Sequence, residues 1–373
     1  MKTFNVASLF AGVGGICLGF QNAKENDKSY KLIYANEIDK YACETYRTNF
    51  KHTLIEGDIN LLLDPDSCKN EQEKEYYKNQ RHYLFDNKID VLNGGFPCQA
   101  FSIAGERKGF EDERGNLFLS IIELINQMDK YSSKPRILFL ENVKNLLAHD
   151  HGRTYRVIKK KLEEDAGYII KEKVLNTMDY TNIPQNRERI YIIGFLNKED
   201  ADKFDFYEKV EKLKNKKSAK EREQDIKRIL DKDISIEKNY EYYYTKEKYP
   251  NYFKDGLDEV NLERDINEKY QFYQCRRGLY VRKNKSNVCP TLTANMGTGG
   301  HNVPLILVDD GIRKLTPAET FKLQGFPVGD GYELPTEYNG KRYSNAQLYK
   351  QAGNAVSVDM ITMIAKEILK ILD

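Results

Sequence analysis

The sequence lacks the features that mark membrane-bound and disulfide-stabilised proteins. No apolar run reaches the about 18 residues of a membrane-spanning helix, so we expect no membrane partner. The N-terminus enters an apolar, strand-like pattern from Phe4 to Ala11, without the basic segment and cleavage site of a signal peptide. The 6 cysteines are irregularly spaced and include no C-x-x-C pair, so neither a disulfide framework nor a metal site is expected. These absences favour a reducing, cytoplasmic location.

Net charge is also small. The formal charge is +2, although 31% of the 373 residues are charged. A nucleic-acid-binding protein needs one basic face rather than a basic total, so this balance excludes no class of partner. The length predicts two domains, or one large domain with an insertion, and 40% apolar residues suffice for a sizeable core.

Short apolar runs alternate with longer polar segments up to about residue 196. Strands alternating with helices predict an α/β fold with a parallel sheet, and the clearest strand candidates are residues 31–35, 89–92, 136–140 and 188–195. Beyond this region we interpret residues 198–238, dense in both charge signs, as a solvated helical face. Residues 273–285 are strand-like and carry five basic side chains, and residues 349–373 predict an amphipathic helix.

Three strand ends carry groups that suit a nucleoside-containing cofactor. Gly12 and Gly14 lie in a turn after the first apolar strand, where glycines let the backbone approach a ligand. Glu37 ends the next strand and can accept hydrogen bonds from ribose hydroxyls, and Asp58 after a third could bond an adenine amino group. The glycine turn alone is weak evidence, because flavin and nicotinamide enzymes use similar turns.

Three further strand ends carry candidate catalytic groups. Cys98 follows a strand and two glycines, which argues against the buried position that most lone cysteines occupy. Glu141 lies among apolar residues, where a carboxyl group can act as an acid, although a capping or ion-paired role is the plainer alternative. Arg187 and Arg189 alternate on a strand and would share one face, where they could hold a carbonyl oxygen or a carboxylate.

Six motifs occur in the order of the cytosine-5 DNA methyltransferase family, which the chain resembles. They are LFAGVGG, GGFPCQAFSIAG, ENV, QNRERIYIIG, RKLTPAETFKLQGFP and QAGNAV. The resemblance covers nearly all of the chain except about residues 198–285. It implies a Rossmann-like S-adenosyl-L-methionine-dependent methyltransferase sheet with a smaller target-recognition domain.

The resemblance also implies a mechanism. The thiolate of Cys98 would attack carbon 6 of a flipped-out cytosine while Glu141 contacts ring nitrogen 3. The enamine formed takes the methyl group at carbon 5, and loss of the carbon 5 proton then expels the thiolate. Arg189 would contact the carbonyl oxygen of the base, and Arg187 would support the closed site.

Cofactor and DNA contacts follow from the same resemblance. The expected contacts to S-adenosyl-L-methionine are Phe10, Gly12, Gly14, Glu37, Ile38, Asp58, Leu117, Asn354 and Val356. Residues 98–117 resemble the family's mobile loop that closes over DNA. The expected DNA contacts are Gln99, Ser102 and Arg107 on that loop, Thr291 near the end of the recognition region, and Arg276, Arg277 and Arg282 as readers of base edges. A merely solvated basic strand is the alternative for these last three.

We therefore expect three parts. Residues 1–196 form the catalytic and cofactor-binding domain, 197–340 the target-recognition domain, and 341–373 a segment that returns to the catalytic domain. Because few residues precede the glycine motif, we expect a stand-alone bacterial or phage modification enzyme, acting on double-stranded DNA in the nucleoid. No obligate protein partner is evident, and a cognate restriction endonuclease is the partner to consider.

Three alternatives remain open at this point. A transfer-RNA methyltransferase of the same superfamily would differ in its substrate, although the long variable segment favours sequence-specific DNA binding. A catalytically inactive DNA-binding protein would keep the fold without turnover, yet the catalytic motifs are intact. A flavin or nicotinamide oxidoreductase would explain the glycine turn alone.

Overall fold

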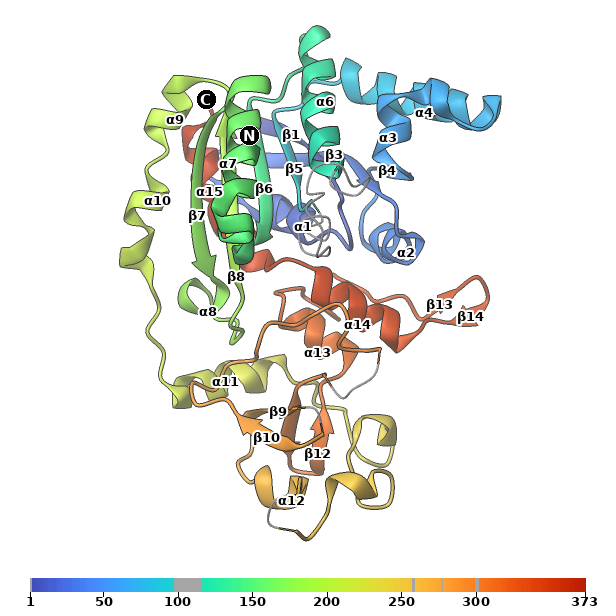
Figure 1. The fold of residues 1–373 in the computed structure, drawn as a ribbon, viewed down its shortest axis with the longest axis vertical. Coiled ribbons are helices and arrows are strands. Elements are labelled where there is room, and N and C mark those ends of the chain that lie inside the picture. The colour runs from blue at the N-terminus through green and yellow to red at the C-terminus, as the bar shows by residue number, and fades with distance from the viewer. Residues whose placement is uncertain (1, 97–115, 257–258, 277, 299–301) are drawn as a thin grey trace. The chain divides into compact units, whose positions relative to one another are not determined.

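The computed structural model describes residues 2–96, 116–256, 259–276, 278–298 and 302–373 (Figure 1). The chain divides into two compact units. The first comprises Met1–Leu175, Glu188–Leu213 and Met360–Asp373, and the second comprises Asn176–Arg187 and Lys214–Asp359. Compared with the boundaries expected from the sequence, residues 176–187 and 341–359 fall in the second unit and residues 197–213 in the first.

The first unit is built on an eight-stranded sheet with the order β2-β3-β1-β5-β6-β8-β7, and β4 pairs with β3. The central pairs β3–β1, β1–β5 and β5–β6 are parallel, whereas β8 runs antiparallel to β6. The strands are β1 Lys2–Leu9, β2 Lys24–Glu25, β3 Lys28–Glu37, β4 Thr53–Glu56, β5 Val91–Gly94, β6 Ile137–Val143, β7 Ile169–Asn176 and β8 Glu188–Phe195.

Helices cover both faces of this sheet. On one face, Leu138 and Leu140 of β6 belong to an apolar cluster with side chains of α3, α4, α6 and α7. Phe139 points the opposite way, as alternation along a strand requires, and its ring lies 5.4 Å from that of Phe20 on α1. Burial on both faces explains why β6 begins with the continuous apolar run of residues 137–140. The helices of this unit are α1 Gly15–Asn22, α2 Lys40–Asn49, α3 Ile59–Leu63, α4 Glu71–Asp86, α6 Asn116–Lys130, α7 Arg153–Lys160, α9 Lys198–Lys203, α10 Phe206–Lys209 and, from Met360 onward, α15 Val358–Ile371.

The second unit contains a four-stranded antiparallel sheet with the order β10-β9-β11-β12. Its own core includes Tyr244, Phe253, Tyr273, Leu305 and Ile312. The strands are β9 Phe272–Arg276, β10 Tyr280–Lys283, β11 Leu305–Val308 and β12 Gly311–Lys314, with a separate hairpin of β13 Glu337–Tyr338 and β14 Lys341–Arg342. The helices are α8 Thr177–Tyr180, α11 Ala219–Ile229, α12 Leu262–Asp265, α13 Pro317–Lys322 and α14 Asn345–Asn354.

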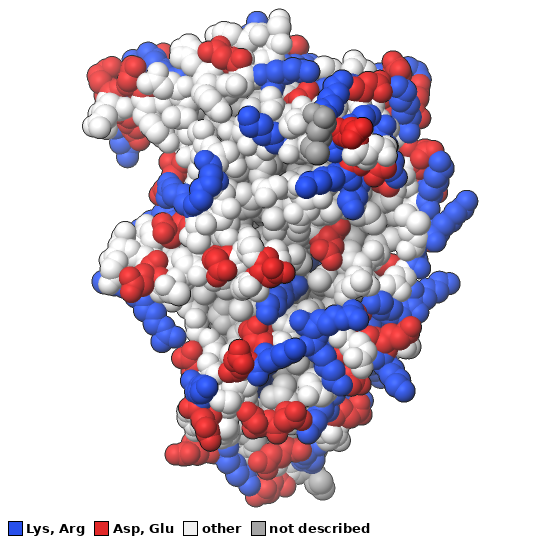
Figure 2. All heavy atoms as spheres, turned by 180° about the vertical axis from the view of Figure 1, so that it is seen from behind, with Lys and Arg blue, Asp and Glu red and all other residues white. Residues whose placement is uncertain are grey.

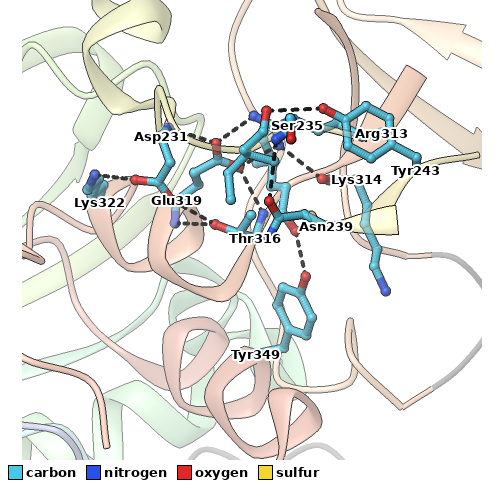
Figure 3. Close-up of polar contacts among 12 residues, drawn as sticks. Asp231, Ser235, Asn239, Tyr243, Arg313, Lys314, Thr316, Glu319, Lys322 and Tyr349 are labelled. Atoms are coloured by element: carbon cyan, nitrogen blue, oxygen red, sulfur yellow. Dashed lines mark hydrogen bonds and ion pairs between the residues drawn. The ribbon is translucent and has the colours of Figure 1, made fainter. Parts of the chain in front are cut away.

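A buried polar cluster joins three segments of the second unit (Figure 3). The Arg313 guanidinium on β12 donates to both carboxylate oxygens of Glu319 on α13, at 2.7 and 2.6 Å. Thr316 caps α13 by accepting from the Glu319 backbone N–H at 3.1 Å. Glu319 also accepts from the backbone of Asp231, and Asp231 accepts from Lys322 at 2.5 Å. The cluster therefore ties the segment after α11 to the RKLTPAE motif.

The single amphipathic helix predicted for residues 349–373 is wrong, because the chain forms two helices there. α14 ends at Asn354, Ala355 is extended, and α15 begins at Val358. The carbonyl groups of Gly353 and Ala355 accept hydrogen bonds from the buried Arg187 side chain rather than continuing the helix. Gly353 and Asn354, at the end of α14, are residue types that commonly end helices, and the prediction of one continuous helix overlooked them.

Surface charge is mixed rather than single-signed. In the view of Figure 2, Lys and Arg side chains lie beside Asp and Glu side chains over most of the visible surface. This agrees with the small net charge of +2. Among the described residues, no helix combines the length and the apolar content that crossing a membrane would require.

Candidate active site

The glycine motif forms a tight turn between β1 and α1. Phe10, Gly12 and Gly14 have positive φ angles of 52°, 55° and 84°. A Cβ atom on Gly14 would lie 2.2 Å from the ring of Phe50, so both backbone conformation and packing require glycine there. A Cβ atom on Gly12 would meet nothing within 4 Å. The backbone at Gly12 is thus open to a ligand on the side where a side chain would stand.

Glu37 lies beside this turn, at the end of β3. Its Oε2 accepts a hydrogen bond from the Gly12 backbone N–H at 2.7 Å, and its Oε1 accepts from the N–H groups of Ile38 and Asp39 at 2.9 and 2.8 Å. Burial raises the pKa of Glu37, and these backbone donors partly offset that effect. A carboxylate has about four acceptor positions, so one remains on Oε2 for a hydroxyl group. The apolar side chain of Ile38 is 64% exposed, so it can pack against a ligand bound beside this turn.

Asp58 and Leu117 are the other predicted cofactor contacts in the first unit. The Asp58 side chain caps α3 by accepting from the backbone N–H of Asn60 at 2.9 Å. The preceding Gly57 donates its backbone N–H to the Glu37 carbonyl at 2.9 Å, which holds the two acidic strand ends close together. Leu117, in the first turn of α6, packs against the same apolar cluster as Phe10. Asn354 and Val356 belong to the second unit.

The strand that leads to Cys98 is β5. Its last residue, Gly94, pairs with Leu9 of β1 on one side and with Leu140 of β6 on the other. Beyond the strand, the Phe96 carbonyl accepts a hydrogen bond from the Asn142 side chain at 3.0 Å. Cys98, Gln99, Ser102 and Arg107 lie outside the described residues, as does Arg277. Sequence reasoning gave Asn142 no role, although its place next to Glu141 near the end of β6 was a signal.

Glu141 is buried and held from one side. Its Oε1 lies 3.1 Å from Nε of Arg189, and both side chains are about one-tenth exposed. The ion pair follows from the antiparallel register of β6 and β8, in which Val143 is opposite Arg189. Oε2 lies 3.6 Å from where a Cβ on Gly95 would stand. This carboxylate oxygen therefore faces the segment that leads to Cys98, and no described residue donates a hydrogen bond to it.

Arg187 has a different environment from Arg189. It precedes β8 rather than lying on the strand, is 2% exposed, and belongs to the second unit. Its guanidinium donates to the carbonyl groups of Leu292 at 3.2 Å, Gly353 at 3.4 Å and Ala355. Gln185, to which sequence reasoning assigned no role, accepts from the Leu292 backbone N–H at 3.3 Å. These two side chains fix the segments that carry Thr291 and Asn354.

Several predicted DNA contacts meet in the second unit. Arg276 and Arg282 line an open pocket of about 520 Å³ together with Thr291. The Thr291 hydroxyl donates to the Asn186 carbonyl at 2.6 Å, which anchors the pocket wall to the QNR motif. In the described part of the chain, no group of three or more His, Cys, Asp or Glu side chains could hold a metal ion.

Comparison with known proteins identifies the family. The family model described as C-5 cytosine-specific DNA methylase matches residues 4–370. The chain is 44% identical to the type II methyltransferase M.Bsp6I of Bacillus sp. (strain RFL6) over 98% of both chains. It is 34% identical to M.HpaII of Haemophilus parainfluenzae, over 99% of this chain and 90% of that one. A solved putative DNA modification methyltransferase of an Escherichia coli prophage matches 99% of both chains with a TM-score of 0.63 and 21% identity. The expected α/β methyltransferase fold is confirmed, and this chain belongs to the C-5 cytosine-specific DNA methylase family.

Proposed function

We propose that this DNA cytosine-5 methyltransferase protects one duplex sequence as the modification enzyme of a restriction–modification system. The observation that carries the catalytic assignment is the Glu141–Arg189 pair, whose outer oxygen faces Gly95 three residues before Cys98. A nucleophile, an acid and a cationic donor on adjacent strand ends suit attack on a poorly electrophilic ring. A flavin or nicotinamide enzyme has no use for this group of residues.

The residues at the glycine turn fit S-adenosyl-L-methionine, the methyl donor of this family. The open backbone at Gly12 suits the methionine part of the cofactor. The remaining acceptor position on Glu37 suits a ribose hydroxyl group, and the exposed Ile38 side chain suits the adenine ring. When bound, the cofactor supplies an electrophilic methyl group. Phe10, Gly14, Asp58 and Leu117 shape this side of the site, and we assign Asn354 and Val356 to the same cofactor.

In the proposed reaction, Cys98 forms a bond from its sulfur to carbon 6 of the flipped cytosine. Glu141, carrying a proton on Oε2 in this step, donates a hydrogen bond to ring nitrogen 3, where negative charge would otherwise build up. Arg189 keeps Glu141 in place, and its Nη2 has no acceptor among the described residues, which leaves it for the carbonyl oxygen of the base. After the methyl group has been transferred to carbon 5, the carbon 5 proton passes to water acting as the base, the double bond between carbons 5 and 6 forms again, and the bond from sulfur to carbon 6 breaks to release the thiolate.

We assign recognition of the DNA sequence to the second unit, and Arg187 a positioning role within it. Arg276, Arg282 and Thr291 supply candidate contacts there, with Arg277 beside them in the sequence. Gln99, Ser102 and Arg107 are assigned to DNA from the loop after Cys98. We place the enzyme in the cytoplasm at the nucleoid, where its substrate lies, and a cognate restriction endonuclease is the proposed functional partner.

Sequencing of bisulfite-treated genomic DNA from a host that expresses the chain tests this function. We expect 5-methylcytosine at one short motif throughout the genome, and none in cells that express Cys98→Ala. Methylated transfer RNA with unmodified genomic DNA would instead support an RNA substrate. Unmodified DNA and RNA with a folded protein would support a catalytically inactive binding protein.

A further inference from the structure

The β9–β10 hairpin has two chemically different faces. Its antiparallel register places Arg282 opposite Gln274 and Tyr280 opposite Arg276. Opposite residues share a face, and residues two apart on one strand share it too, so these four side chains project together. We call this set, Gln274, Arg276, Tyr280 and Arg282, the reading face. The other face is apolar where Tyr273, Cys275 and Val281 pack into the core of the second unit.

Three polar side chains of the reading face have no partner among the described residues. The guanidinium groups of Arg276 and Arg282 and the amide of Gln274 make no hydrogen bond or ion pair with any other described residue. Lys283, on the opposite face of the same hairpin, is paired with Glu268. Elsewhere in the unit, Arg264 pairs with Asp265 at 2.7 Å and Arg313 with Glu319. The second unit thus supplies carboxylates to Arg264 and Arg313, whereas no described carboxylate pairs with Arg276 or Arg282.

Three residues of the reading face, Gln274, Arg276 and Arg282, line the pocket in the second unit. The lining also includes polar side chains from outside the hairpin, among them those of Asn186, Thr291 and Asn295. The described lining includes Arg276 and Arg282 but no Asp or Glu, so the pocket is positively charged. Such a pocket suits groups rich in hydrogen-bond acceptors, which is the character of the guanine edge in the major groove.

We propose that the reading face selects the DNA sequence as two successive rungs, Gln274 with Arg282 and Arg276 with Tyr280. This inference rests on the proposed function and adds Gln274 as a specificity-determining residue. A two-stranded ribbon fits the major groove, where an arginine fork can hydrogen-bond guanine N7 and O6. Rungs two residues apart are separated by about 6.8 Å, which equals about two base-pair steps of 3.4 Å. Arg282 and Arg276 therefore read guanines about two base pairs apart, and Gln274 reads the base beside that of Arg282.

A duplex pool with a fixed target cytosine and randomised flanking bases tests the proposal, with methylated molecules identified by bisulfite sequencing. We expect Arg282→Ala and Arg276→Ala each to lower selectivity for guanine about tenfold or more, at different positions. Gln274→Ala should lower selectivity at the position next to that of Arg282. Arg282→Lys should recover the overall rate but not the selectivity, because an ammonium group lacks the two-pronged geometry. Lys283→Ala, on the other face, should keep the wild-type motif.

The outcomes separate this inference from the proposed function. If wild-type protein methylates no DNA, the proposed function fails. If all four variants of the reading face methylate the unaltered motif with wild-type selectivity, only the reading face is refuted. Methylation that is equally slower at all sequences, with the motif preference unchanged, would likewise contradict the reading face. That result would indicate contacts to phosphate groups rather than to base edges. Because these side chains are not in the core, thermal unfolding should be unchanged in every variant.

Discussion

Glu141 shows how a residue receives its role from its neighbours rather than from its type. One carboxylate oxygen is held by Arg189, and the other faces Gly95. Glu188, on the same strand as Arg189, has a side chain that is 43% exposed and pairs with Lys144 at 2.8 Å. The two glutamates on these neighbouring strands therefore differ in environment. Glu141 is buried at the candidate site, whereas the Glu188 side chain is partly exposed to solvent.

We predict that Glu141→Gln slows methyl transfer by about 10²–10⁴-fold, because the amide cannot supply a proton to ring nitrogen 3. DNA affinity should change much less, since in the proposed reaction Glu141 contacts only the flipped base. Single-turnover rates and binding titrations measure the two effects separately. Glu188→Gln serves as the matched control and should stay within a few-fold of wild type. A wild-type single-turnover rate in Glu141→Gln would remove this residue from the mechanism.

Sequence motifs were enough to propose residues for the site, but the partners of those residues could not be predicted. The motifs pointed to Glu37, Glu141 and both arginines because each follows or precedes an apolar strand. The partners of Arg187 are backbone carbonyl groups of Leu292, Gly353 and Ala355, more than a hundred residues away in the chain. Every residue has a carbonyl group, so no sequence pattern marks such acceptors.

At the scale of elements, buried strands were the most predictable feature. The expected strand at 188–195 coincides with β8, and the one at 136–140 corresponds to β6, Ile137–Val143. Strands buried on both faces carry continuous apolar runs, which stand out in any sequence. The region 198–238 is helical in part, yet Phe206, Tyr207 and Ile226 are buried there, so the interpretation as a solvated face was too simple. The apolar residues of this region occur singly or in pairs between charged residues, so charge dominates the sequence pattern.

The connection between α2 and β4 should respond to pH. His52 is half-buried against the rings of Tyr46 and Phe50, and its Nε2 lies 2.7 Å from the Tyr46 hydroxyl oxygen. Burial lowers the pKa of His52 from its ordinary value of 6.5 to about 4. The unfolded chain therefore binds a proton that the folded chain does not, so the free energy of unfolding should fall as pH drops from about 6.5 to about 4.

Chemical unfolding followed at several pH values measures this dependence. We expect His52→Gln to flatten the slope between pH 6.5 and 4, because the variant has no group that must stay neutral there. The exposed His82 provides the control, and His82→Gln should keep the wild-type slope. An unaltered slope in His52→Gln would show that other groups cause the acid sensitivity.

At the scale of the whole molecule, each unit has its own means of stabilisation. The first unit relies on an apolar sheet covered by helices, whereas the second adds the buried Arg313–Glu319 pair to a smaller core. The side chains of this pair are 2% and 0% exposed. Removing one partner would leave a buried charge without its counter-charge, which costs about 3–5 kcal/mol.

We therefore predict that Glu319→Gln lowers the free energy of unfolding of the second unit by about 3 kcal/mol. Asp309→Asn is the matched control, because its pair with Lys269 is exposed and screened by solvent, so the free energy of unfolding should stay close to that of the wild type. Denaturant titration with probes in each unit would measure both changes. Equal stability of the two variants would mean that the polar cluster of Figure 3 does not hold the second unit together.

The central claim is that Cys98 attacks the target cytosine, and covalent trapping tests it most directly. Duplex DNA with 5-fluorocytosine at the target position cannot lose its carbon 5 substituent after methylation, so the bond from sulfur to carbon 6 should persist. We predict a protein–DNA band that survives denaturing electrophoresis and requires S-adenosyl-L-methionine. Cys68→Ser, which alters a cysteine remote in sequence from the motif, should retain this band, and Cys98→Ser should abolish it. An undiminished band in Cys98→Ser would contradict the account.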